Sequence, residues 1–261
     1  MSTMHFYKYQ GTGNDFIILD NRSMTYNALT TERIKFLCDR RFGIGADGLM
    51  LLNTMPGYDF EMKYYNSDGR ESSLCGNGSR CLVRFAHDIG MHKNNYHFIA
   101  SDGAHEAEID VDGKISVKMK DVEDVREYHG DSILDTGSPH YVKIVSDVMD
   151  YDVFHKGMDI RHSPEFAKEG INVNFVEQKR SDEIIVRTYE RGVEDETLSC
   201  GTGVTASALV AYHNECGYND VTVITRGGKL TVRFDRTPMG SFVNVWLSGP
   251  AEKVFEGDIQ G

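Results

Sequence analysis

The sequence predicts an α/β protein made of two similar domains, and three observations support this prediction. Short strand patterns are numerous and helix patterns are few; a segment around residue 75 recurs near residue 200; and a charged stretch with little apolar pattern separates the two copies. A chain of 261 residues suits two domains, since one domain typically takes about 150 residues. The composition, with 40% apolar and 26% charged residues, is that of a globular protein with a packed core.

The predicted strands are short runs rich in β-branched and aromatic residues, bounded by turn residues. In the first half they cover residues 16–19, 49–52, 61–65, 98–100 and 115–119. In the second half they cover residues 141–145, 174–177, 184–189, 221–225, 230–234 and 243–247. Asp-Gly and Gly-Gly pairs at 111–114 and 226–229 lie between such runs and favour hairpin turns there.

Three helices are predicted. The first covers residues 30–38 and begins with a threonine cap. The second begins just after the Cys-Gly-Asn-Gly segment at Cys75 and extends to about His87. The third begins after Cys-Gly-Thr-Gly at Cys200 and extends to about Cys216.

The two cysteine segments resemble each other at a single offset, 200 − 75 = 125 residues. The identical pairs at this offset are Tyr64/Tyr189, Glu71/Glu196, Cys75/Cys200, Gly76/Gly201, Gly78/Gly203 and Ala86/Ala211. We interpret this as duplication of one α/β unit. The boundary is expected between Met119 and Ser132, which gives domains of residues 1–122 and 123–261. The last strands, about 242–261, are expected to return to the first domain.

A net charge of −12 argues against binding to nucleic acid or to an anionic membrane. No apolar stretch approaches the roughly 18 residues of a membrane-spanning helix, and the first residues lack the apolar region of a secretory signal.

The five cysteines, at positions 38, 75, 81, 200 and 216, include no CxxC pair. This argues against a structural zinc site and a thioredoxin-like motif. No His, Asp and Glu cluster has metal-ligand spacing, and nothing resembles a phosphate-binding loop with a Schiff-base lysine, so we expect no cofactor. Scattered free thiols are typical of the cytoplasm. Cys38, Cys81 and Cys216 fall in predicted helices and are interpreted as core thiols.

A cysteine at a helix start is stabilised as the thiolate, because unpaired N–H groups and the helix dipole favour negative charge there. The flanking glycines let the backbone approach a bound anion. A single copy would be more typical of a glycine-rich turn with a buried structural cysteine. Two copies in a duplicated unit favour a shared cleft between the domains. Two such thiols suit the inversion of an amino-acid Cα, in which one takes a proton from one face and the other returns a proton to the opposite face.

Five segments, which begin at Gly11, Tyr65, Cys75, Tyr189 and Thr197, resemble the signatures of the diaminopimelate epimerase family. The resemblance runs from His5 to the final strands. It implies two pseudo-symmetric α+β domains, each a mostly antiparallel sheet or barrel wrapped around a central helix, with the active site at their interface. It also implies cofactor-independent epimerisation of LL-diaminopimelate to the meso form, on the route to lysine and peptidoglycan, by a homodimer.

The resemblance assigns roles position by position. It makes Cys75 and Cys200 the acid–base pair, with His140 and Glu190 placed to influence a catalytic thiol. The residues that it assigns to substrate binding are Asn14, Asn66, Gly76, Asn77, Asn172, Glu190, Arg191, Gly201 and Thr202. Within that set, Arg191 can grip a distal carboxylate with two parallel hydrogen bonds.

Several of these residues have another explanation. Asn14 suits a left-handed turn, Asn66 suits an ordinary turn, Arg191 suits the solvated surface, and His140 suits a structural loop. Two further positions depart from the family pattern, which commonly has Asn at Ser138 and Gln at Gly48. Both departures concern recognition of the distal end of the substrate.

Two other functions remain open. One is an epimerase or racemase of the same fold that acts on another amino acid, such as proline or hydroxyproline. The other is a redox-sensing protein in which Cys75 and Cys200 form a regulated disulfide.

Overall fold

The computed structural model describes residues 3–72, 75–212 and 214–260. The chain divides into two compact units, of which unit 1 comprises Met1–Val117 and Gly249–Gly261, and unit 2 comprises Lys118–Ser248. The sequence places the division after residue 122 and assigns about 242–261 to the first domain. In the structure only residues from Gly249 onward belong to unit 1.

Unit 1 is a curved sheet with two helices. Its elements are β1 (Thr3–Gly11), β2 (Asn14–Asp20), α1 (Thr31–Cys38), β3 (Gly48–Asn53), β4 (Phe60–Asn66), β5 (Glu71–Ser72), α2 (Gly76–Asp88), β6 (Asn95–Ala100), β7 (Gly103–Ile109), β8 (Ile115–Lys118) and β18 (Glu252–Gln260). The strands pair in the order β18–β1–β2–β3–β4–β6–β7–β8, with β5 on β4. The pairs β2–β3 and β4–β6 are parallel and the others antiparallel.

Unit 2 repeats this pattern. Its elements are β9 (Arg126–Tyr128), β10 (Asp131–Asp135), β11 (Pro139–Ile144), the 3-10 helix η1 (Val148–Asp150), α3 (Val153–Arg161), β12 (Asn172–Arg180), β13 (Glu183–Glu190), β14 (Asp195–Thr197), α4 (Gly201–Val210), β15 (Gly217–Thr225), β16 (Gly228–Arg236) and β17 (Phe242–Gly249). The order is β9–β10–β11–β12–β13–β15–β16–β17, with β14 on β13. Here β11–β12 and β13–β15 are the parallel pairs, at the places equivalent to those in unit 1.

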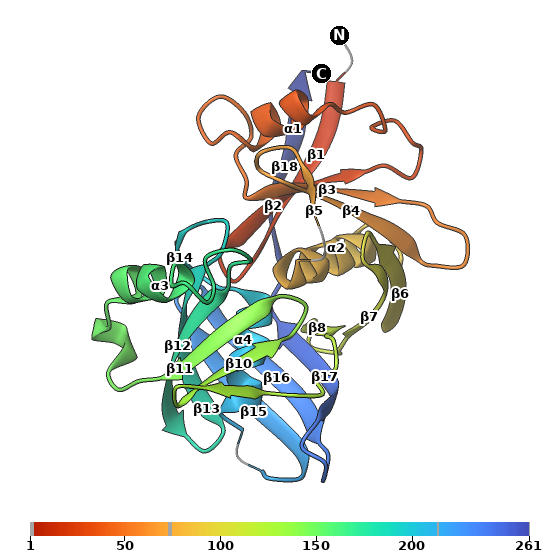
Figure 1. Cartoon of the computed structure of the whole chain (residues 1–261). Coiled ribbons are helices and arrows are strands. Elements are labelled where there is room, and N and C mark those ends of the chain that lie inside the picture. The colour runs from red at the N-terminus through yellow and green to blue at the C-terminus, as the bar shows by residue number, and fades with distance from the viewer. Residues whose placement is uncertain (1–2, 73–74, 213, 261) are drawn as a thin grey trace. The chain divides into compact units, whose positions relative to one another are not determined.

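Each unit packs its sheet around one helix (Figure 1). Helix α2 contacts β1, β2, β3 and β18, and α4 contacts six strands of unit 2. Most residues of both helices are buried. Helix α4 is buried on nearly all sides, as expected of a helix enclosed by other elements. The structure thus confirms the predicted fold class of mostly antiparallel sheet around a central helix. Within the described part of the chain, every helix is too short or too polar to span a lipid bilayer.

The sequence-based prediction differed from the structure at several places, and it missed the strands β1, β5, β7, β9, β10 and β14. Helix α4 ends at Val210 rather than near Cys216, because the chain turns there toward β15. Cys216 is consequently exposed and is not a core thiol. Helix α3, Val153–Arg161, was not predicted. The segment just before Cys75, at 73–74, and residue 213, within the helix predicted after Cys200, lie outside the described residues.

Candidate active site

Cys75 and Cys200 occupy equivalent backbone positions. Cys75 directly precedes α2 with φ −108° and ψ 119°, and Cys200 directly precedes α4 with φ −111° and ψ 112°. The Cys75 carbonyl accepts from the Ser79 amide at 2.7 Å, and the Cys200 carbonyl accepts from the Val204 amide at 2.8 Å. Each thiol therefore lies beside a first helical turn, where backbone N–H groups and the helix dipole favour negative charge.

The four predicted carboxylate-binding residues are the first two residues of each helix, Gly76 and Asn77 in α2 and Gly201 and Thr202 in α4. Asn77 is 2% exposed. The Thr202 hydroxyl lies 3.5 Å from the Cys200 sulfur. Backbone amides at a helix start suit an anionic group, so these residues are placed where a carboxylate could bind.

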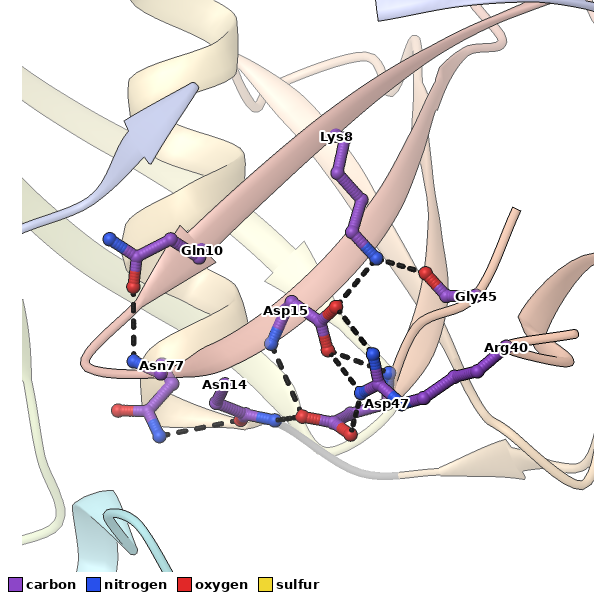
Figure 2. A network of polar contacts seen from close by, with 9 residues as sticks. Lys8, Gln10, Asn14, Asp15, Arg40, Gly45, Asp47 and Asn77 are labelled. Atoms are coloured by element: carbon purple, nitrogen blue, oxygen red, sulfur yellow. Dashed lines mark hydrogen bonds and ion pairs between the residues drawn. The ribbon is translucent and has the colours of Figure 1, made fainter. Parts of the chain in front are cut away.

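Asn14, the first residue of β2, contacts Asn77 in α2 and Asp47 in the loop before β3 (Figure 2), and it also contacts Cys75. The Cys75 thiol donates to Asn14 Oδ1 at 3.7 Å, and Asn77 Nδ2 donates to the same oxygen at 3.3 Å. Asn14 Nδ2 donates to Asp47 Oδ2 at 2.6 Å. Because the amide nitrogen is held by a carboxylate, the amide oxygen is directed toward the thiol.

An ion-pair network lies behind Asn14 (Figure 2). Asp15 pairs with Lys8 at 2.7 Å and with Arg40 at 2.7 Å, and Arg40 also pairs with Asp47 at 2.7 Å. Burial alone would raise the pKa of Asp15, but hydrogen bonds and charge from Arg40 and Lys8 outweigh it and hold that pKa well below its usual range. Asp47 is thereby fixed as an acceptor for Asn14.

The turn explanation is wrong for Asn14, because the left-handed residues before β2 are Thr12, with φ 51°, and Gly13, with φ 84°. The turn explanation does fit Asn66. Its backbone amide donates to the Arg70 carbonyl and its carbonyl accepts from the Gly69 amide, and these two bonds close the turn after β4. Asn66 is exposed, and its side chain makes no hydrogen bond to another described residue. Its role in substrate binding stays a prediction.

The space beside Gly48 is filled by its neighbour strand. A Cβ at residue 48 would lie 2.5 Å from Tyr64 Cε2 and 2.6 Å from the Tyr65 carbonyl oxygen. Any side chain at this position would therefore collide with β4. Glycine at position 48 is thus required by the packing of this chain.

His140 lies in β11 and is fully buried, so it is not a loop histidine. Asn174 Nδ2 donates to His140 Nδ1 at 3.0 Å, while His140 Nε2 has no hydrogen-bond partner among the described residues. Burial lowers the pKa of His140 to about 3. The ring is therefore neutral near pH 7 and carries its proton on Nε2, since Nδ1 accepts from Asn174. A Cβ on Gly203, in the first turn of α4, would lie 3.3 Å from the imidazole and 2.3 Å from Asn174 Oδ1.

Arg191 is held in place by Ser138 and Asn172. Ser138 Oγ accepts from Asn172 Nδ2 at 3.0 Å and from Arg191 Nη2 at 3.1 Å. Asn172 Oδ1 accepts from the Arg191 backbone amide at 2.9 Å, and Arg191 Nη1 donates to the Glu169 carbonyl at 3.0 Å. Arg191 is half-buried and anchored, which contradicts the solvated-surface explanation. Glu190 precedes it at the end of β13 and is half-buried.

Asn174 and Asp47 contact candidate site residues but were not predicted from the sequence. Asn174 follows Asn172 by two residues in β12, so both side chains lie on one face of the strand. Two asparagines on one face of a buried strand are unusual, and this was the available signal. Asp47 gave no signal, because its link to Asn14 spans 33 residues.

Cys38 and Cys81 are buried core thiols, as predicted. Burial raises the pKa of Cys38 to about 12 and raises that of Cys81 as well. Both remain protonated near neutral pH and are unsuited to acid–base work there.

Known proteins resemble the chain over its whole length. The family model described as diaminopimelate epimerase matches residues 6–125 and 132–246. The diaminopimelate epimerase of Flavobacterium psychrophilum is 49% identical over 257 residues, which cover 98% of this chain and 100% of that protein. The corresponding protein of Chlorobaculum tepidum is 41% identical, with coverage of 95% and 98%.

A solved structure shows the same fold. The phenazine biosynthesis protein of the PhzF family from Bacillus anthracis superimposes with a TM-score of 0.77, and both chains are covered completely. Its sequence identity is 15%, so this likeness concerns the fold alone.

Proposed function

Because the chain belongs to the diaminopimelate epimerase family, we propose that it interconverts LL- and meso-diaminopimelate without a cofactor, on the route to lysine and peptidoglycan. The observation that supports this most is the matched placement of Cys75 and Cys200. Each precedes a buried helix with nearly the same backbone angles.

The first step of the proposal is binding of the carboxylate next to the reacting carbon. Backbone N–H groups of Gly76 and Asn77 in one unit, and of Gly201 and Thr202 in the other, are its donors. As the Cα proton leaves, negative charge spreads onto this carboxylate. Donors that are already oriented stabilise that charge more than they stabilise the substrate, which lowers the barrier.

The second step is proton exchange on opposite faces of Cα. One cysteine, as thiolate, takes the Cα proton and becomes a thiol. The other, as thiol, gives its proton to the opposite face and becomes the thiolate. One proton enters the substrate and one leaves, so the pair ends with its charge exchanged and the product epimerised. The two thiols share one proton between them, and their titration is therefore coupled.

The distal end of the substrate is assigned to Arg191, Asn172 and Glu190. A guanidinium has five N–H donors, and in the described structure Arg191 uses them on Ser138 and on the Glu169 carbonyl. The remaining donors can bind a carboxylate. Glu190 is placed beside Arg191 to accept from an ammonium group. Ser138, where the family commonly has Asn, holds Arg191 and Asn172 rather than reaching outward.

The decisive experiment incubates the purified protein with LL-diaminopimelate in heavy water, followed by chiral separation and mass spectrometry. The proposal predicts meso product with deuterium at the inverted carbon. Product without solvent deuterium would contradict the proton-exchange route. Parallel assays with proline and hydroxyproline test the rival substrates, and activity after exhaustive chelation tests independence from metals.

The redox alternative makes a different prediction. A thiol switch would form a Cys75–Cys200 disulfide reversibly under mild oxidation and show no epimerisation in the reduced state. We also expect the protein to act in the cytoplasm, a location consistent with its five free cysteines. Cell fractionation tests that expectation. The homodimer that the family resemblance implies stays a prediction, which analytical ultracentrifugation tests.

A further inference from the structure

Helix α2 carries a fully buried arginine five residues after Cys75, and its guanidinium contacts the two residues that follow that cysteine. Arg80 lies in the second turn of the helix and is 0% exposed, which makes it the largest fully buried side chain among the described residues. Arginine is almost never fully buried without a partner of opposite charge, and its guanidinium stays charged in proteins.

Every acceptor around the guanidinium is uncharged within the described part of the chain. Arg80 Nη2 donates to Asn77 Oδ1 at 2.9 Å and to Thr12 Oγ1 at 3.4 Å. Nη1 donates to the Gly76 carbonyl at 3.3 Å, and Nε donates to the Pro250 carbonyl at 3.4 Å. The group is thus satisfied in hydrogen bonds but not in charge.

Few titratable groups face Arg80. Its electrostatic interactions are with the thiols of Cys81 and Cys75, and burial lowers its pKa. Cys81 is kept neutral by burial. From β2, Asp15 acts on Cys81, but its charge is already matched by Lys8 and Arg40. Cys75 is the remaining neighbour that can become an anion.

The equivalent position in unit 2 carries no charge. Residue 80 + 125 = 205 is a threonine, which is fully buried in α4 and donates from Oγ1 to the Gly201 carbonyl at 3.0 Å. The duplicated helix therefore has a cation behind one cysteine and a neutral hydroxyl behind the other.

We propose that Arg80 is a positioning residue whose buried charge favours the thiolate of Cys75, so that Cys75 loses its proton more readily than Cys200. The inference rests on the proposed function, in which the two thiols share one proton. Asn14 acts in the opposite direction, since its Oδ1 accepts from the Cys75 thiol at 3.7 Å. A thiol is a weak hydrogen-bond donor, whereas a buried charge acts in a medium of low dielectric, so the arginine prevails.

Arg80 also orders the amides beside the thiol. Its bond to Asn77 Oδ1 fixes which end of that amide is the oxygen. The Asn77 nitrogen is then the end that donates to Asn14. One guanidinium thereby sets both the charge and the hydrogen-bond direction around Cys75.

The test measures alkylation by iodoacetamide as a function of pH, with each cysteine quantified separately by peptide mass spectrometry. The variants are Arg80→Met, which removes the charge, and Arg80→Lys, which retains it. We expect Arg80→Met to raise the Cys75 midpoint by about one pH unit, so that its alkylation near pH 7 slows by roughly tenfold. Arg80→Lys should restore most of this rate. Exposed Cys216 is the internal control, and its alkylation rate should not change in the Arg80 variants. Thr205→Val is the matched control in α4, and it should leave the Cys200 midpoint unchanged.

An unchanged Cys75 midpoint in folded Arg80→Met overturns the inference. If that variant does not fold, the alkylation midpoints of Cys75 and Cys200 are compared in the wild-type protein. A Cys75 midpoint at or above that of Cys200 is incompatible with the proposed asymmetry. These measurements need no substrate. A wild-type protein that epimerises LL-diaminopimelate but shows no such asymmetry contradicts only this inference, whereas the converse result contradicts only the proposed function.

Discussion

The starts of α2 and α4 have nearly the same backbone conformation, but the side chains that surround them differ. Behind Cys75 are charges: the buried guanidinium of Arg80 and the Lys8, Asp15, Arg40 and Asp47 network that fixes Asn14. In unit 2, the groups packed against the first turn of α4 include the neutral ring of His140 and the amide of Asn174. Duplication thus preserved the helix start that suits an anion, while the surroundings of the two thiols diverged.

The largest effect is expected from removing each of the two thiols in turn. Cys75→Ala and Cys200→Ala should each reduce epimerisation by at least about a thousandfold, because acid–base groups typically contribute 10²–10⁴ and the reaction needs both. The measurement is the rate of conversion of LL-diaminopimelate, with circular dichroism to establish folding. Cys216→Ala is the control, since that thiol is exposed. Near-normal turnover in either single variant would eliminate the two-base scheme.

The second prediction concerns the second glycine of each helix start. Gly203→Ala should destabilise the protein by about 2–3 kcal/mol, because its Cβ would lie 2.3 Å from Asn174 Oδ1. Gly78→Ala should cost less than about 1 kcal/mol. Its closest contact is the flexible Met50 sulfur at 3.2 Å, and alanine is the better helix former. Urea unfolding compares the two directly, and equal losses would mean that the two helix starts are packed alike.

The third prediction uses His140. Its pKa is lowered from 6.5 to about 3 in the folded protein, so the unfolded chain binds the proton first as the pH falls. Stability is therefore lost as the pH drops from about 6.5 toward 3, by about 1.4 kcal/mol per unit. Between pH 7.5 and pH 5, wild type should lose about 2 kcal/mol more than His140→Gln. Denaturant unfolding at both pH values measures this, and parallel losses would show that His140 is not buried as a neutral ring.

The smallest expected effect is at Ser138. Ser138→Ala removes the acceptor for Asn172 and Arg191, and a neutral hydrogen bond contributes about 1 kcal/mol. We expect KM to rise by about fivefold with little change in kcat, since only distal binding is affected. Ser138→Thr keeps the hydroxyl and serves as the control. An equal effect in both variants would mean that the hydroxyl contributes nothing.

The duplicated elements could be predicted from the sequence, because each cysteine segment is a local signal for a helix start after a strand. Helix α3 could not, since Gly157 weakens its helix pattern. That glycine is required by packing: a Cβ there would lie 2.4 Å from Tyr189 Cβ. Strand β18 gives only a weak signal because most of its residues are exposed, and it forms by pairing with β1.

The residues of the candidate site likewise divide into those that could be predicted from the sequence and those that could not. Residues within the motifs, such as Asn77 and Thr202, could be named from sequence because their helix position follows directly from the cysteine. The partners that orient them could not, because Asp47 and Asn174 reach their targets through tertiary contacts. Arg80 stands inside a motif, but that it is fully buried without a described counter-charge is a property of the folded unit alone.

The pairing of β1 with β18 affects the order in which the two units can complete their sheets as the chain is synthesised. Residues 3–10 align with residues 252–260, so β1 is synthesised long before the strand that pairs with it. Lys118–Ser248 can close its own sheet earlier. Until then, β1 offers an unpaired edge, a known hazard for aggregation, and Arg80 lacks the Pro250 carbonyl. Substitutions in β18 that weaken its pairing with β1 are therefore expected to disturb unit 1, although they lie far along the sequence from most of it.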